Sequence, residues 1–168
     1  GNTWTKQDGT SGVDQVTKDN TSSTDNISPY IVYNKNDLPV IINQQIVGTL
    51  NYIQNHRYTT SGVINQTIYS IESYSQSLPI ATLQKYGMNA GRIWVTWHGM
   101  DSIDTMRNNI RVSYSDDDGA TWSIPTKLTS GNAYHQYSPT ITSDINGNVY
   151  IVWYGVTTTN PSYSNIRQ

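Results

Sequence analysis

Residues 115–122 constrain the fold of this chain more than any other feature. They read Ser-Asp-Asp-Asp-Gly-Ala-Thr-Trp, and the second half of the same pattern occurs at residues 1–4, Gly-Asn-Thr-Trp. Asp117 lies where a short carboxylate accepts the backbone N–H groups of a tight turn, and Gly119 supplies the positive φ that such a turn needs. Trp122 follows as a strand residue with a large apolar ring. The pattern predicts a hairpin that recurs along the chain.

Three longer segments repeat one plan, in which an X-Pro pair leads through an extended stretch, a polar turn and a second extended stretch. They cover residues 28–42, 78–97 and 138–153. Trp97 and Trp153 are 56 residues apart, and a decayed copy of the 115–122 pattern lies at residues 58–62. Such a period indicates a β-propeller built from blades of four antiparallel strands.

In the middle unit we expect strands at residues 80–83, 92–97, 109–115 and 121–128 (strands A, B, C and D of a blade). The chain is then a single propeller segment, residues 1–168, with repeats at approximately 5–61, 62–118 and 119–168. The fold class predicted is all-β, with about three blades.

Composition agrees with an all-β chain. There are 13 Tyr and no Phe, and Glu72 is the only Glu, so helix formers are scarce. The net charge of −2 gives no indication of nucleic-acid binding, and no apolar run is long enough to insert into a membrane. The absence of Cys excludes disulfides and thiolate metal sites.

Three blades do not close a ring, because propellers have about four to eight. The free sheet faces would then expose large apolar surfaces. We expect the missing neighbours to be further blades of a longer parent chain, and a second copy of this chain is the alternative. The half-pattern at residues 1–4 favours the longer chain.

The repeated pattern resembles the Asp-box of the sialidase-like (bacterial neuraminidase repeat) β-propellers, and the resemblance covers essentially the whole chain. In that family the Asp-boxes are structural turns between strands C and D at the blade periphery, away from the ligand site. The residues that match the motif are Ser115, Asp117, Gly119, Thr121 and Trp122. The resemblance therefore implies that these residues stabilise the fold and do not catalyse.

The resemblance also implies that the ligand face is built by the D-to-A connections (residues 9–26, 73–77 and 130–137) and the B-to-C connections (43–51, 98–108 and 154–164). Acid, imidazole, guanidinium and phenol groups gather there, a combination suited to sugar binding or acid–base work. A role as ordinary loop residues is the alternative. The candidates are His98, Asp101, Asp104, Arg107, Tyr134, His135, Tyr137 and Tyr154.

A complete sialidase site is not visible. The family uses an arginine triad, a Tyr nucleophile assisted by Glu, and an Asp acid/base, with the first arginine in an [FY]-R-I-P motif that this chain lacks. Arg111 and Arg167 recur at one repeat position on strand C, which favours a structural role. Glu72 is expected on a D strand at the periphery. Asp101 and Asp104 are three residues apart on one loop, a poor arrangement for flanking a glycosidic bond.

No cofactor is expected. Residues 116–118 are three consecutive Asp, but they lack the alternating ligands and distal Glu of a calcium-binding EF-hand loop, so calcium is the minor alternative. His56, His98 and His135 share no zinc-ligand spacing.

Three functions remain open. The first is a secreted or cell-surface propeller scaffold that binds a glycan or a protein, for which Tyr-rich loops are suited. The second is part of an exo-sialidase or related glycoside hydrolase whose other catalytic residues lie outside this chain. The third is a structural component of a surface layer, filament or viral fibre. Whether the chain is an enzyme stays undecided by the sequence.

Overall fold

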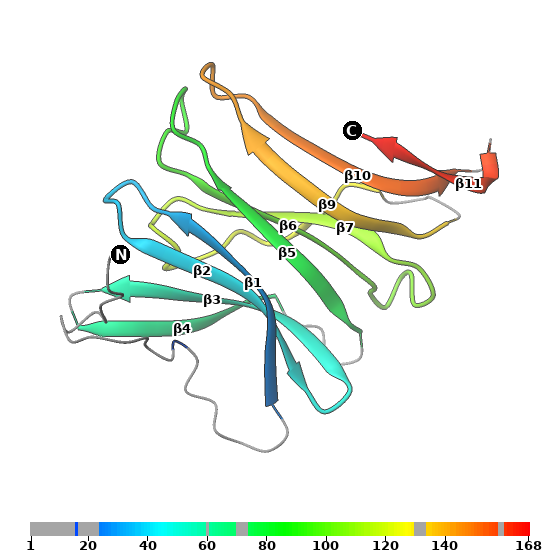
Figure 1. Cartoon of the computed structure of the whole chain (residues 1–168), viewed down its shortest axis with the longest axis horizontal. Helices are drawn as coiled ribbons and strands as arrows, with labels where there is room; N and C mark the ends of the chain where they lie inside the picture. Colours follow the sequence, from blue (N-terminus) through cyan, green and yellow to red (C-terminus); the bar gives the residue numbers. More distant parts are fainter. Residues whose placement is uncertain (1–15, 17–23, 60, 70–73, 130–133, 158–159) are drawn as a thin grey trace, which may run out of the picture.

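The computed structural model describes residues 16, 24–59, 61–69, 74–129, 134–157 and 160–168. In these ranges eleven strands form three antiparallel sheets (Figure 1). None of the described residues forms a helix able to cross a membrane. The strands are β1 (Thr24–Tyr33), β2 (Pro39–Val47), β3 (Leu50–Thr59), β4 (Gly62–Tyr69), β5 (Gln76–Leu83), β6 (Ile93–Gly99), β7 (Asn109–Ser115), β8 (Thr126–Lys127), β9 (Gln136–Ser143), β10 (Val149–Thr157) and β11 (Asn160–Arg167).

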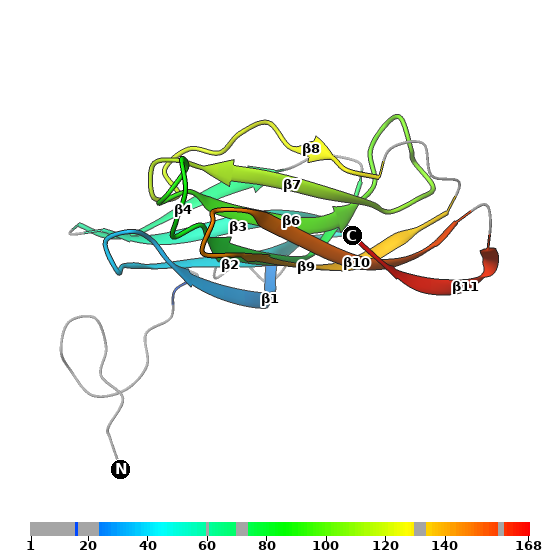
Figure 2. The same cartoon turned by 90° about the horizontal axis from the view of Figure 1, so that it is seen from above.

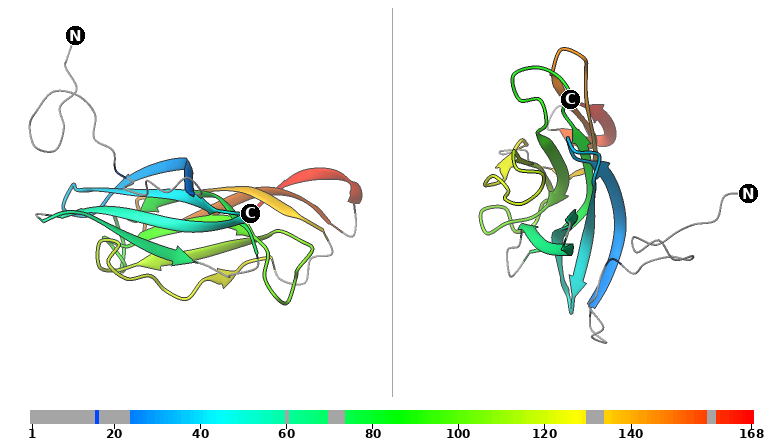
Figure 3. Two further views of the ribbon diagram at one scale, coloured as in Figure 1. Left: turned by 90° about the horizontal axis from the view of Figure 1, so that it is seen from below. Right: turned by 90° about the vertical axis from the view of Figure 1, so that its left-hand side faces the viewer.

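Each sheet is an up-and-down meander of consecutive strands. Sheet 1 has the order β1-β2-β3-β4, sheet 2 the order β5-β6-β7-β8, and sheet 3 the order β9-β10-β11. The first strands β1, β5 and β9 lie next to one another. The sheets follow one another as twisted layers (Figure 3), and β8 lies at the outer edge of sheet 2 (Figure 2). The predicted four-stranded units are therefore present in sheets 1 and 2.

The turns between the first two strands of sheets 1 and 3 use the same device. In sheet 1 the Asn34 side chain accepts the backbone N–H groups of Asn36 and Leu38 at 2.9 and 3.0 Å. In sheet 3 the Asp144 side chain accepts those of Asn146 and Asn148 at 2.9 and 2.8 Å. These bonds replace ladder hydrogen bonds where the chain reverses direction, so a short polar side chain at this point closes the hairpin.

The X-Pro pairs mark a bulge in the first strand of every sheet. Ser28, Leu78 and Ser138, which each precede Pro, have φ values of 51°, 53° and 46°. Positive φ is uncommon for residues with a side chain, and Pro has no N–H to give to the ladder. The pairing register shifts at the same places. The repeated X-Pro pair seen in the sequence is therefore a repeated β-bulge.

The described core lies between sheets 1 and 2. Sheet 1 buries aliphatic side chains from β1 to β4, and sheet 2 buries side chains from β5 and β6 against them, with Trp122 packed at the margin. Burial of this apolar surface supplies the main stabilisation between the two layers. The buried members are Val32, Val40, Ile42, Ile53, Ile68, Ala81, Ile93, Val95 and Trp97.

Residues 115–122 form a tight turn between β7 and β8. Asp117 Oδ1 accepts the Thr121 N–H at 2.8 Å and Asp117 Oδ2 accepts the Thr121 hydroxyl at 2.6 Å. The Ser115 hydroxyl donates to Asp117 Oδ1 and accepts the Gly119 N–H, both at 2.8 Å. Asp118 and Gly119 have φ values of 59° and 85°. In this turn Asp117 accepts two bonds from Thr121, and Gly119 supplies a positive φ.

The turn also joins two sheets. The Gly119 carbonyl accepts Asn55 Nδ2 from sheet 1 at 2.9 Å, and Asp118 Oδ2 accepts Asn36 Nδ2 at 3.0 Å. A Cβ on Gly119 would lie 3.0 Å from Asn55 Nδ2. The glycine therefore supplies both a positive φ and a close approach between sheets.

Some expected boundaries are wrong. Of the D strand expected at 121–128, only β8 forms. Ser123 donates its N–H to the Tyr114 carbonyl at 2.8 Å, but the Tyr114 N–H bonds to the Ser123 hydroxyl at 3.0 Å, so a side chain replaces a ladder bond there. The B-to-C loop expected at 43–51 is a tight turn at residues 48–49, since β2 and β3 stay paired up to it. Much of the loop expected at 154–164 belongs to β10 and β11. Residues 1–4 and Glu72 lie outside the described residues.

Candidate functional site

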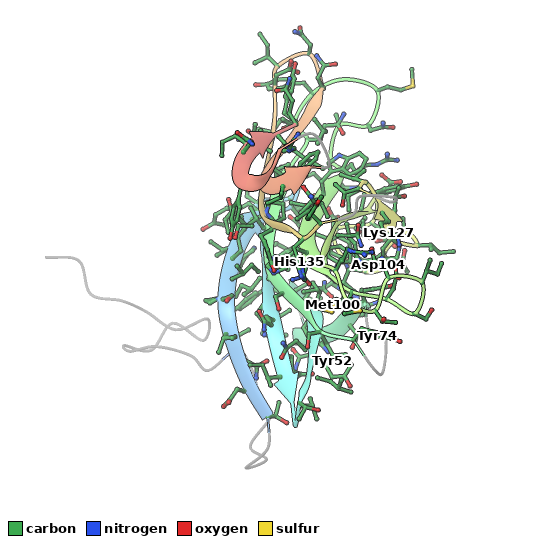
Figure 4. The ribbon with its side chains drawn as sticks, turned by 90° about the vertical axis from the view of Figure 1, so that its right-hand side faces the viewer. Tyr52, Tyr74, Met100, Asp104, Lys127 and His135 are labelled. Carbon is green, nitrogen blue, oxygen red and sulfur yellow. The ribbon has the colours of Figure 1, made fainter. Side chains whose placement is uncertain are left out.

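The connection between β6 and β7 and the approach to β9 lie at one end of the sheets, opposite the end that carries the β1–β2, β5–β6 and β9–β10 turns (Figure 1). This loop end faces the viewer in Figure 4, where Met100, Asp104 and His135 are labelled. It is the end at which the sequence predicts the ligand face. Most of the candidate side chains contact one another there, in a ring cluster and an ionic cluster.

The ring cluster consists of His98, His135, Tyr137 and Tyr154. The His135 ring stacks on Tyr137 with centroids 5.3 Å apart and an interplanar angle of 11°. His98 meets the same ring edge-on at 5.3 Å, and Tyr154 lies 5.7 Å away on the paired strand β10. Tyr137 thus joins rings from sheets 2 and 3 into one surface.

Backbone contacts fix both imidazoles. His135 Nδ1 accepts the Asn108 N–H at 3.1 Å, which ties the β6–β7 loop to the cluster. His98 Nδ1 is 3.4 Å from the Ser138 N–H. Burial, and then the charge of nearby His135, lower the pKa of His98 to about 4. His98 is therefore neutral at physiological pH and acts there as a hydrogen-bonding and packing group.

Asp101 anchors the ionic cluster. Its carboxylate accepts from Arg111 on β7 and from Lys127 on β8, the latter at 3.0 Å. Oδ1 accepts the backbone N–H groups of Ile103 and Asp104 at 2.9 and 2.8 Å. The carboxylate therefore holds the first turn of the β6–β7 loop against the sheet.

This environment keeps Asp101 ionised. Burial alone would raise the pKa of its carboxyl, but the bonds from Arg111, Lys127 and the loop backbone outweigh burial and hold the pKa well below its usual value. Arg111 is 3% exposed, and its guanidinium lies 5.5 Å from the Tyr69 ring centroid of sheet 1. Burial raises the pKa of Tyr69. The strand-C arginine is thus part of a buried contact between sheets.

Asp104 and Arg107 complete the loop. Asp104 Oδ2 accepts Asn109 Nδ2 at 3.1 Å, and Asp104 Oδ1 lies 3.4 Å from Arg107 Nη1. Arg107 is exposed. Tyr134, the last candidate, contributes a backbone carbonyl that accepts Gln136 Nε2 at 3.1 Å. Among the charged candidates Asp101, Asp104 and Arg107, Arg107 therefore has the most exposed side chain.

A repeated glutamine–tryptophan pair, which the sequence did not predict, lies beside this end. Gln76 Oε1 accepts the Trp97 indole N–H, and Gln136 Oε1 accepts that of Trp153, both at 2.9 Å. A Cβ on Gly99 or Gly155 would lie 2.0 Å from the same Oε1 atoms, so glycine leaves the room that each Gln side chain needs to reach its Trp. The signal was available, because Trp-x-Gly recurs with the 56-residue period and Gln precedes each of these X-Pro pairs by two positions.

The three carboxylates of residues 116–118 bond to three different partners. Asp116 pairs with Arg92 at 2.7 Å, Asp117 closes its own turn, and Asp118 reaches Asn36. Within the described ranges, no group of three or more His, Cys, Asp or Glu is placed to hold a metal.

No protein-family model matches the sequence, and neither does any curated protein. Among solved structures, the chain is similar to an α-L-arabinofuranosidase from Lactobacillus brevis, with a TM-score of 0.54 and 14% identity over 88% of this chain and 49% of that chain. It is also similar to a GH43 endo-arabinanase from Bacillus licheniformis, with a TM-score of 0.49 and 16% identity over 88% of this chain and 54% of that chain.

Both of these enzymes are five-bladed β-propellers, and the chain spans about half the length of each. The similarity to the arabinofuranosidase, together with the three meander sheets, confirms the predicted class: the chain is an all-β protein with blades of a β-propeller. Three sheets make an incomplete ring. The comparisons support the propeller and do not extend to the sialidase-like family.

Proposed function

We propose that this propeller segment binds a carbohydrate at its loop end. The observation that carries the proposal is the ring cluster, which brings His98, His135, Tyr137 and Tyr154 together from two sheets. Tyr154 is 39% exposed, so part of its ring is available to stack on a sugar. The fold shared with an α-L-arabinofuranosidase supports a glycan as the ligand.

The test is a glycan array followed by calorimetry on the 168-residue chain. We expect Tyr154→Ala to lower the affinity for the best-bound glycan at least about tenfold, because the variant loses one stacking ring. Tyr150→Ala is the matched control, because Tyr150 lies on the same strand, is 50% exposed, and sits at the turn end beside Asp144. Equal losses in both variants, or no glycan bound, would contradict the proposal.

Assignment to the sialidase-like Asp-box propellers, and location in a secreted or cell-surface protein, belong to the same proposal. The turn bonds of Ser115, Asp117, Gly119 and Thr121 support the first. Further blades from a longer chain, or a second copy, are the proposed partners of the free sheet faces. Light scattering separates these cases, since a six-bladed ring requires a dimer.

A glycoside hydrolase is the second candidate, favoured by the similarity to an α-L-arabinofuranosidase. The Asp101 carboxylate is poorly suited to proton transfer, because Arg111 and Lys127 keep it ionised. Release of reducing sugar from arabinan, or of sialic acid from a sialoside, by the chain alone would make hydrolysis its function. Binding without turnover favours the scaffold. Ordered assembly without any ligand would favour the third function, a structural fibre or layer.

A further inference from the structure

Sheet 1 departs from its two sister sheets at one set of equivalent positions. The first hairpin of each sheet closes at one strand pair, and these pairs serve to align the three sheets with one another. They are Tyr33–Pro39 in sheet 1, Leu83–Ile93 in sheet 2 and Ser143–Val149 in sheet 3. In this alignment both sheets 2 and 3 have Gln, Trp and Gly at three equivalent positions, namely Gln76, Trp97 and Gly99 in sheet 2 and Gln136, Trp153 and Gly155 in sheet 3. Sheet 1 has Asn26, Asn43 and Gln45 at these positions. All three members differ together, as expected if the Gln–Trp pair needs the glycine.

A cavity of about 230 Å³ lies at this place in sheet 1. Its lining includes Asn26 and Asn43, the two positions at which the other sheets carry Gln and Trp. A carboxamide is much smaller than an indole, so the exchange leaves space. The lining residues are Val16, Asn26, Pro29, Ile41, Asn43 and His56.

The size of this cavity limits what it can hold. It is distinct from a second cavity of about 310 Å³, which the three X-Pro pairs line where β1, β5 and β9 meet. Drug-sized ligands occupy pockets of about 300–1,000 Å³. The cavity in sheet 1 is smaller than these, and therefore has room for one sugar ring or a molecule of similar size.

The polar wall of the cavity is held rigidly. Asn43 Nδ2 donates to Asn26 Oδ1 at 2.9 Å and to the Gln44 carbonyl at 3.2 Å, which directs Asn43 Oδ1 toward His56 Nε2 at 2.6 Å. His56 Nδ1 lies 2.8 Å from Asn65 Oδ1, and His56 is only 1% exposed. A buried network of this kind is preorganised for a polar ligand.

We propose that this cavity binds a neutral, hydroxyl-rich molecule of monosaccharide size. The six lining residues include no Asp, Glu, Lys or Arg, so nothing in the wall selects an ion. The Asn26 amide N–H groups can donate to hydroxyl groups, and Asn43 Oδ1 keeps one lone pair beyond its contact with His56, while Ile41 and Pro29 offer an apolar surface for ring C–H groups.

The site lies on the face of sheet 1 opposite to sheet 2, because the alternate residues Val40, Ile42 and Ile53 pack against sheet 2. It is separate from the ring cluster of sheets 2 and 3. A further blade or a second copy on that face would close the site, so the sugar and such a partner are alternatives there.

The test is saturation-transfer NMR and calorimetry on the 168-residue chain with L-arabinose, D-xylose, D-galactose and D-glucose. We expect saturable binding of at least one sugar. The triple variant Asn26→Gln/Asn43→Trp/Gln45→Gly installs the arrangement of the sister sheets and fills the cavity. It should weaken binding at least about tenfold, because the ligand's space is taken.

Ile41→Trp is a second way to fill the cavity, should the triple variant fail to fold. Its matched control is Ile64→Trp, an exposed position on β4 of the same sheet outside the lining, which should bind as the unmodified chain does. No saturable binding of any of the four sugars, or undiminished binding by the filled variants, overturns the proposal. Loss in Tyr154→Ala alone would place the sugar at the ring cluster and overturn it equally.

Discussion

The two ends of the sheets both carry ion pairs, but in different surroundings. At the loop end, Arg111 and Asp101 are paired with side chains that are 4% and 10% exposed. At the turn end, Arg92 and Asp116 are paired with side chains that are 16% and 59% exposed. Removing one partner of a buried pair strands a charge, whereas water solvates the survivor of an exposed pair. The loop end is thus held by buried charge, and the turn end by short bonds to the backbone.

The largest effect is expected from Arg111→Ala. It leaves the Asp101 carboxylate buried with Lys127 as its remaining cationic partner, so the free energy of unfolding should fall by about 3–5 kcal/mol. Urea denaturation measures the change. Arg107→Ala, which removes an exposed partner of Asp104, is the control and should change stability by less than about 0.5 kcal/mol. Similar losses in both variants would contradict the comparison.

His98 predicts a pH dependence at the loop end. Its pKa is about 4 in the folded protein and 6.5 in the unfolded chain, so the unfolded chain takes up the proton first as pH falls. The contribution of neutral His98 to the free energy of unfolding is fully present above pH 6.5. It is lost as the pH falls to about 4, which lowers the free energy of unfolding by about 3 kcal/mol. Urea denaturation from about pH 7.5 to 4 should show this slope, and His98→Gln should flatten it. An unchanged slope would show that other groups cause it.

Asp117→Ala is the next test and concerns the turn end. The carboxylate accepts the Thr121 N–H and hydroxyl, and its removal should cost about 1–3 kcal/mol. Thermal melting of this variant beside Asp117→Asn measures the cost of the lost acceptor. An unchanged melting temperature would mean that the turn bonds do not stabilise the chain.

The sequence predicted the sheets better than the site. The X-Pro pairs, the polar turns and residues 115–122 act locally, so their hairpins could be predicted from short segments. The partners of Asp101 could not, because Arg111 and Lys127 come from other strands and only the pairing of β6, β7 and β8 brings them together. His98 and Tyr137 likewise meet across two sheets. Asn26 and Asn43 of the sheet 1 cavity could not be predicted as a pair either, because only the strand pairing shows that they occupy the Gln and Trp positions of the other sheets.

The smallest effect is expected from Arg92→Ala. Its bonds to Asp116 Oδ1 and Oδ2, at 2.7 and 2.9 Å, face solvent on the Asp116 side, and such pairs contribute about 0–1 kcal/mol. The guanidinium also lies 3.8 Å from the Tyr114 ring centroid, which adds an aromatic contact of about 0.5–1 kcal/mol. Because salt screens the ion pair more than the ring contact, comparing Asp116→Ala with Arg92→Ala at low and high salt separates the two contributions. A loss in Asp116→Ala as large as that in Arg111→Ala would mean that burial does not distinguish the two ends.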